Sequence, residues 1–501
     1  MANSGAKGDE ATTTTPAREV GWRWEHTYAQ LPSWLHVGVA PTPVGAPKWV
    51  ILNQVLAREL GLAEAALAGG AGMESLVGNR IPAGAAPLAQ AYAGHQFGHL
   101  TTLGDGRAIL LGEHVTARGE RFDIQLKGAG PTPFSRRGDG RATLVSMLRE
   151  YVISEAMHAL GIPTTRSLAV VATGEEIWRG QPRPGGVLTR VAASHLRVGT
   201  FVGAAAGADE AGLRALIDYT LWRHYPEQQG AANRALALFA AVVARQASLL
   251  AKWMLVGFVH GVMNTDNMAL SGETIDYGPC AFLDHYDPAT VFSSIDRHGR
   301  YAFGQQPRIA QWNLARLAEA LLPRLHAEEA VGIALANEAI QKFTIIFQTQ
   351  WLAGMRRKLG LFNEELEDGI LVEDLLAWMQ TTKADFTNTF AKLARSTGEA
   401  VGASSPDEGW RRWEARWRAR LGRQVESAGA AVALRCAHCP AFIPRNHLVE
   451  AALAAAEVGE MRELERLLDI VAAPYDHSRV APEYRAPAPD GGAGYQTFCG
   501  T

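Results

Sequence analysis

The chain has 501 residues, of which 47% are hydrophobic and 20% are charged, a balance that excludes a largely disordered protein. Its 48 Lys and Arg residues against 51 Asp and Glu residues give a formal net charge of −3, which argues against a dedicated nucleic-acid-binding protein. Four cysteines are too few for the disulfide framework of a small secreted domain.

The sequence contains no evident targeting or membrane segment. Residues 1–22 lack the apolar run of a signal peptide and the arginines of a transit peptide. The longest apolar run, residues 235–244, is soon followed by charged residues, whereas a membrane span needs roughly 18 apolar residues or more. We therefore expect a cytoplasmic protein with neither a membrane nor a nucleic acid as partner.

The first part of the folded chain, residues 21–200, has a β-rich pattern after a polar tail over residues 1–20 that we expect to be disordered. Apolar and polar residues alternate over 121–127, and a short polar link joins this run to 107–113, which predicts an antiparallel hairpin. Residues 142–160 have helical spacing and end at Gly-Ile-Pro, and further strands are expected over 167–172 and 187–191.

Beyond residue 200 the pattern becomes helical up to residue 471 and is then extended over 472–501. Helices are expected over 213–225, 233–256, 309–325, 328–359 and 447–471. This order predicts an α+β fold of two lobes, in which 21–200 form the β-rich lobe and 201–471 the helical lobe, with a cleft between them.

A glycine-rich tetrapeptide, GDGR, precedes the first hairpin strand at 104–107 and recurs at 138–141. Gly104 and Gly106 allow backbone N–H groups to approach an anion, and Arg107 offers a charged fork for phosphate oxygens. Alone, such a tetrapeptide is most often a plain turn. The chain has neither a Walker A motif nor a complete GxGxxG, which excludes the two commonest phosphate loops.

Lys127 ends the second hairpin strand, and Glu150 lies in the middle of the following predicted helix. A strand lysine behind a glycine-rich hairpin, paired with a helix glutamate, orients nucleotide phosphates in protein kinases. Each residue alone is typical of a solvated surface. Together with the loop, the strand and the spacing they favour a nucleotide-binding lobe.

The sequence HGVMNTDNMALSGETIDYG at 260–278 carries the strongest signal. Asp266, Asn267 and Asp276 supply oxygen ligands suited to a hard cation such as Mg²⁺. Asp276 begins a D-Y-G similar to the metal-binding D-F-G of kinases, and HGVMNTDN aligns with H-R-D-L-x-x-x-N. Val262 occupies the position of the kinase catalytic aspartate and cannot accept a proton, so Asp266 is the available carboxylate.

These motifs resemble the selenoprotein O family of kinase-like protein adenylyltransferases. The resemblance runs from about Trp22 to the C-terminus and rests on AYAGHQFGHLTTLGDGRAILLGE, DIQLKGAGPTPFSRRGDGRATLVSMLREYVISEAM, HGVMNTDNM, TIDYGP, IPRNH and YQTFC. It implies a protein-kinase-like fold with additional C-terminal helices that binds ATP in a reversed orientation. AMP is then transferred to Ser, Thr or Tyr hydroxyls of proteins and pyrophosphate is released, with Mg²⁺ or Mn²⁺ as cofactor.

The resemblance also implies roles that the residue pattern alone does not give. Arg190 and Arg197 look like the arginines that hold the terminal phosphate, and Asp266 is similar to the proton acceptor. Asn267 and Asp276 resemble the metal ligands. The expected nucleotide contacts are Gly104, Gly106, Arg107, Lys127, Asp139, Gly140, Arg190, Arg197 and Asp276, with Glu150 in support.

Cys499 stands where some family members carry selenocysteine, and the resemblance implies a redox disulfide with a cysteine of the activation segment. Cys280, directly after DYGP, is the candidate partner, and the alternative is two unlinked thiols.

Other functions remain open on the sequence. One is transfer of another nucleotidyl group, such as UMP, favoured by Mn²⁺. Val262 favours a second, a pseudokinase that binds ATP without catalysis. A third is a phosphotransferase that acts on small molecules.

Overall fold

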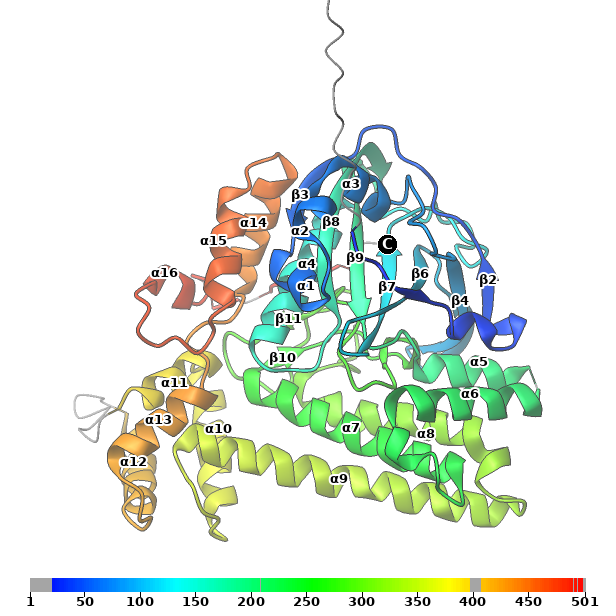
Figure 1. The fold of residues 1–501 in the computed structure, drawn as a ribbon. Coiled ribbons are helices and arrows are strands. Elements are labelled where there is room, and N and C mark those ends of the chain that lie inside the picture. Colours follow the sequence, from blue (N-terminus) through cyan, green and yellow to red (C-terminus); the bar gives the residue numbers. More distant parts are fainter. Residues whose placement is uncertain (1–19, 208, 397–406, 490, 493, 499–501) are drawn as a thin grey trace, which may run out of the picture.

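The computed structural model describes residues 20–207, 209–396, 407–489, 491–492 and 494–498. The first half of the chain is built on a nine-stranded antiparallel sheet of order β2-β4-β6-β7-β9-β8-β3, with β1 beside β6 and β5 beside β4 (Figure 1). The strands are β1 (Trp24–Glu25), β2 (His36–Gly38), β3 (Lys48–Leu52), β4 (Leu88–Gln96), β5 (His99–Gly104), β6 (Ala108–Val115), β7 (Arg121–Lys127), β8 (Arg166–Trp178) and β9 (Pro182–Ala192).

Side-chain alternation along the central strands gives this sheet two apolar faces. Ile109 and Leu111 of β6 belong to a core shared with helices α1 (Gln54–Glu59), α2 (Glu64–Ala68) and α3 (Gly70–Val77). Leu110, between them, belongs to the opposite core, against helix α4 (Leu144–Ala159). The sheet is therefore covered by helices on both sides.

The second half of the described chain is mainly helical. Its long helices pack around α7, and Figure 1 shows α9 running along the edge of the molecule below α7 and α8. The helices are α5 (Val198–Ala206), α6 (Glu210–His224), α7 (Arg234–Val256), α8 (Gln306–Leu325), α9 (Glu329–Leu359), α10 (Asp368–Thr382), α11 (Phe386–Ala394), α12 (Glu408–Leu421), α13 (Ala428–His438), α14 (Asn446–Glu457), α15 (Arg462–Val471) and α16 (Pro482–Arg485).

Two short strands hold the loop that carries the candidate metal and acid–base residues. β10 (Phe258–Val259) and β11 (Ala281–Phe282) pair antiparallel, so residues 260–280 leave and return at the same place. The loop contains one turn of 3₁₀ helix, η4 (Thr265–Asn267), and lies against the end of β4 and the start of α5. The loop therefore contacts the sheet half of the chain at the end of β4.

Two helices among the described residues, α7 and α9, are long and apolar enough to cross a membrane by length and composition alone. The sequence analysis expected no membrane span because no uninterrupted apolar run is long enough. α7 and α9 nevertheless reach the length and hydropathy of a span, because a few charged residues within them are tolerated. In the most apolar stretch of α7, 56% of the residues are buried inside the fold, as in the core helices of globular proteins. The corresponding share for α9 is 22%.

The structure confirms the α+β fold class, with a β-rich first half and a helical second half, and the hairpin of β6 and β7. The single helix expected over 447–471 is wrong, because Gly459, with φ +90°, lies in the break between α14 and α15. The strand β3 and the helices α10–α13 were not predicted. Of the tail expected over 1–20, only residue 20 lies within the described part.

Candidate active site

Lys127 ends β7 with its ammonium group directed toward helix α4 and the 260–280 loop. Its Nζ donates to Glu150 Oε2 at 2.6 Å and to Asp276 Oδ1 at 2.7 Å. The side chains of Lys127 and Glu150 are both buried. The structure thus joins the strand lysine, the helix glutamate and the aspartate of the D-Y-G sequence.

Two arginines add to this cluster from neighbouring elements. Arg190 lies on β9, and its Nη1 donates to Asp276 Oδ1 at 2.6 Å and to Glu150 Oε1 at 3.1 Å. Arg197 is the N-cap residue of α5, and its Nη1 donates to Asp276 Oδ2 at 2.5 Å and to the backbone carbonyl of Asp266 at 2.7 Å. The Arg197 guanidinium also lies 4.8 Å from the ring centre of Tyr92.

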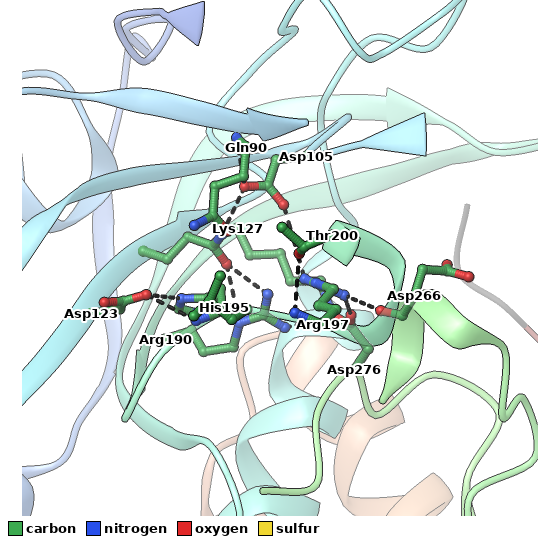
Figure 2. A network of polar contacts seen from close by, with 12 residues as sticks. Gln90, Asp105, Asp123, Lys127, Arg190, His195, Arg197, Thr200, Asp266 and Asp276 are labelled. Carbon is green, nitrogen blue, oxygen red and sulfur yellow. Dashed lines mark hydrogen bonds and ion pairs between the residues drawn. The ribbon is translucent and has the colours of Figure 1, made fainter. Parts of the chain in front are cut away.

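Asp276 is the point at which all three cations meet, as Figure 2 shows for Arg197. Its backbone has φ +62°, the left-handed conformation that non-glycine residues adopt rarely, which indicates that the surrounding contacts impose its position. Burial alone would raise the pKa of this carboxyl, but Lys127, Arg190 and Arg197 together hold it well below its usual range. Asp276 is therefore an anion.

Asp266, in η4, is a further carboxylate of the site, and its environment differs from that of Asp276. Its carboxylate points away from Arg197 (Figure 2); Oδ1 has no hydrogen-bond partner among the described residues, and Oδ2 accepts only a 3.5 Å contact from Gln96 Nε2. Burial raises the pKa of Asp266 to about 6. A carboxylate with a free oxygen and such a pKa is suited to accept a proton near neutral pH.

Two glycines make the space that Asp266 occupies. A Cβ on Gly94 of β4 would lie 2.2 Å from Asp266 Oδ1, and a Cβ on Gly199 of α5 would lie 2.2 Å from the carbonyl of Ala93. A side chain at either position would displace β4, α5 or the loop.

Asn267 follows Asp266, and its Nδ2 donates to the Val262 carbonyl at 3.0 Å. Val262 is itself buried, and His260 is held through its Nε2 at the Ile275 carbonyl and by stacking on Trp253. Within the described ranges, no group of three or more His, Cys, Asp or Glu residues is arranged to hold a metal ion. Asn267 and Asp276 would need further ligands from elsewhere.

The first GDGR sequence forms the turn between β5 and β6. A Cβ on Gly104 would lie 2.3 Å from the Phe134 ring, and one on Gly106 would lie 3.1 Å from the Phe134 carbonyl, so both glycines allow close packing. The Arg107 carbonyl accepts from Gly128 N at 2.7 Å, which connects this turn to the end of β7.

The second GDGR sequence has other contacts. Gly140 has φ +65°, and a Cβ there would lie 2.1 Å from the Gly130 carbonyl. Asp139 binds Arg179 in a bidentate pair at 2.8 Å and caps Arg141 N, so its described partners are not those of Asp276.

Two residues that the sequence analysis did not single out connect the cations. Gln125 Oε1 accepts from both Nε and Nη2 of Arg190, and its Nε2 donates to Asp105 Oδ2 at 3.1 Å. Burial raises the pKa of Asp105 to about 6, and its carboxylate lies 3.9 Å from Arg197. A signal existed for both: Asp105 lies within GDGR, and Gln125 shares a strand face with Lys127 because side chains alternate.

Cys280 is buried at the end of the loop, and Cys499 lies outside the described residues. Thr497 pairs in parallel with Ser293, which places the described end of the chain beside the segment that follows Cys280. The proposed Cys280–Cys499 disulfide stays a prediction.

A buried strand lysine that pairs with a helix glutamate and faces the aspartate of a D-Y-G sequence is the arrangement of the protein-kinase fold. The fold and the site together define a kinase-like protein.

Comparison with known proteins places the chain more narrowly. The family profile described as protein adenylyltransferase SelO matches residues 20–472, so the chain belongs to the SelO family. The protein nucleotidyltransferase YdiU of Alkaliphilus metalliredigens is 56% identical over 491 residues, covering 98% of this chain and 100% of the relative. That of Halalkalibacterium halodurans is 58% identical over 486 residues, covering 96% and 98%.

Among solved structures, the chain is similar to ROP2 from Toxoplasma gondii, described as a virulence factor with a protein-kinase fold and no enzymatic activity. The TM-score is 0.26 at 10% identity, over 67% of this chain and 88% of ROP2.

Proposed function

We propose that the protein transfers AMP from ATP to Ser, Thr or Tyr hydroxyls of other proteins and releases pyrophosphate. One observation carries the proposal: Lys127, Arg190 and Arg197 converge on one side of the site, while Asp266 Oδ1, which has no hydrogen-bond partner among the described residues, lies on the other. Membership of a family described as protein adenylyltransferases, with relatives named protein nucleotidyltransferases, supports the same reaction.

In this reaction negative charge develops on the leaving pyrophosphate while the acceptor hydroxyl loses a proton. Cations on one side of the site and a carboxylate on the other suit these two changes. The acceptor oxygen forms a bond to the α-phosphorus, the bond from the α-phosphorus to the bridging oxygen breaks, and the electron pair leaves with pyrophosphate. Fixed cations at Lys127, Arg190 and Arg197 would stabilise the charge that develops on the leaving group. Asp266 would orient the acceptor hydroxyl and take its proton.

Mg²⁺ or Mn²⁺ fits the donor set of the loop. Asn267 and Asp276 offer hard oxygen ligands, and a small divalent cation typically completes its shell with water and substrate phosphates, so a third acidic ligand is not required. When bound, the cation would neutralise phosphate charge. We place Gly104, Gly106, Arg107 and Gly140 in the nucleotide loops, with Asp139 as a further nucleotide contact.

Incubation with ATP labelled on the α- or the γ-phosphate tests the reaction. α-Label on protein is expected, whereas γ-label would indicate phosphorylation, and neither label would indicate a pseudokinase. Asp276→Ala should reduce α-label incorporation by about 10²-fold or more. Asp374→Asn, in an exposed ion pair with Arg416, is the matched control, and an unchanged rate in Asp276→Ala would contradict the metal assignment.

The identity of the base is a second question, because the relatives are named for nucleotidyl transfer without a base. Equal concentrations of labelled ATP and UTP, each with Mg²⁺ and with Mn²⁺, would separate AMP transfer from UMP transfer. We expect ATP to be preferred. We further propose a cytoplasmic location, in keeping with the sequence.

A further inference from the structure

We propose that a basic rim beside Asp266, formed by His95, Arg300, Trp312 and Arg316, selects acidic segments of the protein that accepts the nucleotide. The inference rests on the proposed function and names the chemistry of its acceptor. A hydroxyl that reaches Asp266 must bring its neighbouring residues across the surface immediately outside the loop. The composition of that surface therefore decides which neighbours are favoured.

The end of β4 connects this rim directly to Asp266. Gly94 contacts the Asp266 carboxylate, and the next residue, His95, donates its backbone N–H to Thr265 Oγ1 at 2.7 Å. The His95 ring then packs edge-on against Trp312 of α8, with ring centres 5.4 Å apart. Trp312 therefore contacts His95, the residue of β4 that directly follows Gly94.

Two guanidinium groups lie over the Trp312 ring. The Arg300 guanidinium lies 4.7 Å from the ring centre and that of Arg316 lies 4.8 Å from it. Both residues are only partly exposed, and the Nε atoms of both have no hydrogen-bond partner among the described residues. Arginine stacked on an aromatic ring keeps its outer N–H groups aligned for a carboxylate.

Hydrogen bonds to Asp296 and Asn264 fix the segment that carries Arg300. Asp296 accepts the backbone N–H groups of Arg300 at 2.9 Å and Tyr301 at 2.7 Å, and Tyr301 donates its hydroxyl to Asn264 at 2.5 Å. Asn264 in turn accepts from Phe97 N in the β4–β5 turn. The rim is therefore pre-organised against the same loop that presents Asp266, which lowers the entropy lost on binding.

The charge of this region contrasts with that of the whole chain. Residues 297–316, between Asp296 on one side and Glu319 on the other, contain four arginines and no Asp or Glu, within a protein of net charge −3. Within the described ranges, Arg300 makes no ion pair, and Arg316 pairs only with the exposed Glu319, at 2.5 Å. Burial, and after it the Arg316 guanidinium, lowers the pKa of His95. The complement of such a rim is a carboxylate.

Matched peptides test the preference with the full-length protein. Two unstructured peptides of equal length carry the same central Ser, Thr and Tyr, flanked by Glu in one and by Lys in the other. Label from α-labelled ATP is followed with the wild type, with Arg300→Gln/Arg316→Gln and with Arg300→Glu/Arg316→Glu. Arg324→Gln, on the same helix but at its far end, is the control.

The wild type and the control should use the Glu peptide with a kcat/KM roughly tenfold above that for the Lys peptide, mainly through KM. The Gln variant should lose this preference and the Glu variant should reverse it, with the KM for ATP unchanged. A structural role of the arginines would not reverse the preference. Thermal midpoints close to that of the wild type verify folding.

Equal use of both peptides by the wild type, or a preserved preference in the Gln variant, would overturn the inference while leaving the proposed function intact. Binding of a single-stranded RNA oligonucleotide at this rim more tightly than the Glu peptide would also overturn it. Label in neither peptide, from a chain that still binds ATP, would contradict protein-directed transfer and the inference with it.

Discussion

Asp276 and Asp266 have opposite environments although one arginine binds both residues. Arg197 Nη1 contacts the Asp276 carboxylate and the Asp266 backbone carbonyl, so it fixes the spacing of the two without neutralising the Asp266 side chain. Three cations depress the pKa of Asp276, whereas burial raises that of Asp266 to about 6. Because their pKa values are shifted in opposite directions, the two carboxylates are suited to separate tasks: Asp276 to charge compensation and Asp266 to proton transfer.

The pKa of Asp266 predicts how the rate depends on pH. Because the residue must be ionised to accept a proton, kcat/KM should be low in acid and rise to a plateau, with a midpoint at about 6. Asp266→Asn should lower the plateau by about 10²-fold or more. Initial rates of α-label transfer between pH 5 and 8 measure both.

Asp105→Asn is the control for this profile, because burial also raises the pKa of Asp105 to about 6. The acid limb should survive in that variant. A rate independent of pH across the range, or a wild-type rate in Asp266→Asn, would remove Asp266 from the reaction.

At the scale of elements, local pattern predicts some site residues and cannot predict others. The β6–β7 hairpin and helix α4 follow from alternation and helical spacing, so Lys127 and Glu150 were accessible from the sequence. Local pattern does not identify Arg190, which only the family resemblance implied, because its place depends on the pairing of β7 with β9, in which Gln125 lies opposite Arg190. This contact joins strands 65 residues apart, and nothing local encodes it.

Gly94 tests whether the fit between β4 and the loop matters. An alanine there would bring a Cβ to 2.2 Å from Asp266 Oδ1 and 2.5 Å from Leu103, and both side chains would have to move. We expect Gly94→Ala to lower the rate by about tenfold or more, since a shift of about 1 Å in a positioned group is costly. Initial rate and thermal midpoint measure the effect.

Gly38→Ala is the matched control, because it also lies on a strand of the sheet and a Cβ there meets nothing within 4 Å. It should change stability by no more than about 0.5 kcal/mol and leave the rate unaltered. Wild-type activity in Gly94→Ala would show that Asp266 tolerates displacement.

Across the whole molecule, the site depends on both halves of the chain. The sheet supplies Lys127 and Arg190, the 260–280 loop supplies Asp266 and Asp276, and Arg197 lies where α5 begins. The C-terminal helices brace the same region, because Glu450 of α14 pairs with Arg149 beside Glu150. Ligands that engage the cations and the loop together should therefore stabilise the whole fold.

Binding of metal and nucleotide should be coupled. Asp276 already compensates three cations, and in the described part of the chain no cluster of three acidic or His/Cys ligands awaits a metal. Mg²⁺ alone should therefore leave the thermal midpoint unchanged. Mg²⁺ with ATP, at 100 times the dissociation constant, should add about 2.7 kcal/mol of stability and raise the midpoint.

In Asp276→Ala the three cations lose their shared carboxylate and can pair with the triphosphate directly. ATP with EDTA should then raise the midpoint as much as ATP with Mg²⁺, whereas the wild type and Asp374→Asn should still require the metal. Thermal unfolding of the three proteins under these conditions measures the difference. A midpoint raised by Mg²⁺ alone in the wild type would mean that the loop forms a complete metal site before the nucleotide arrives.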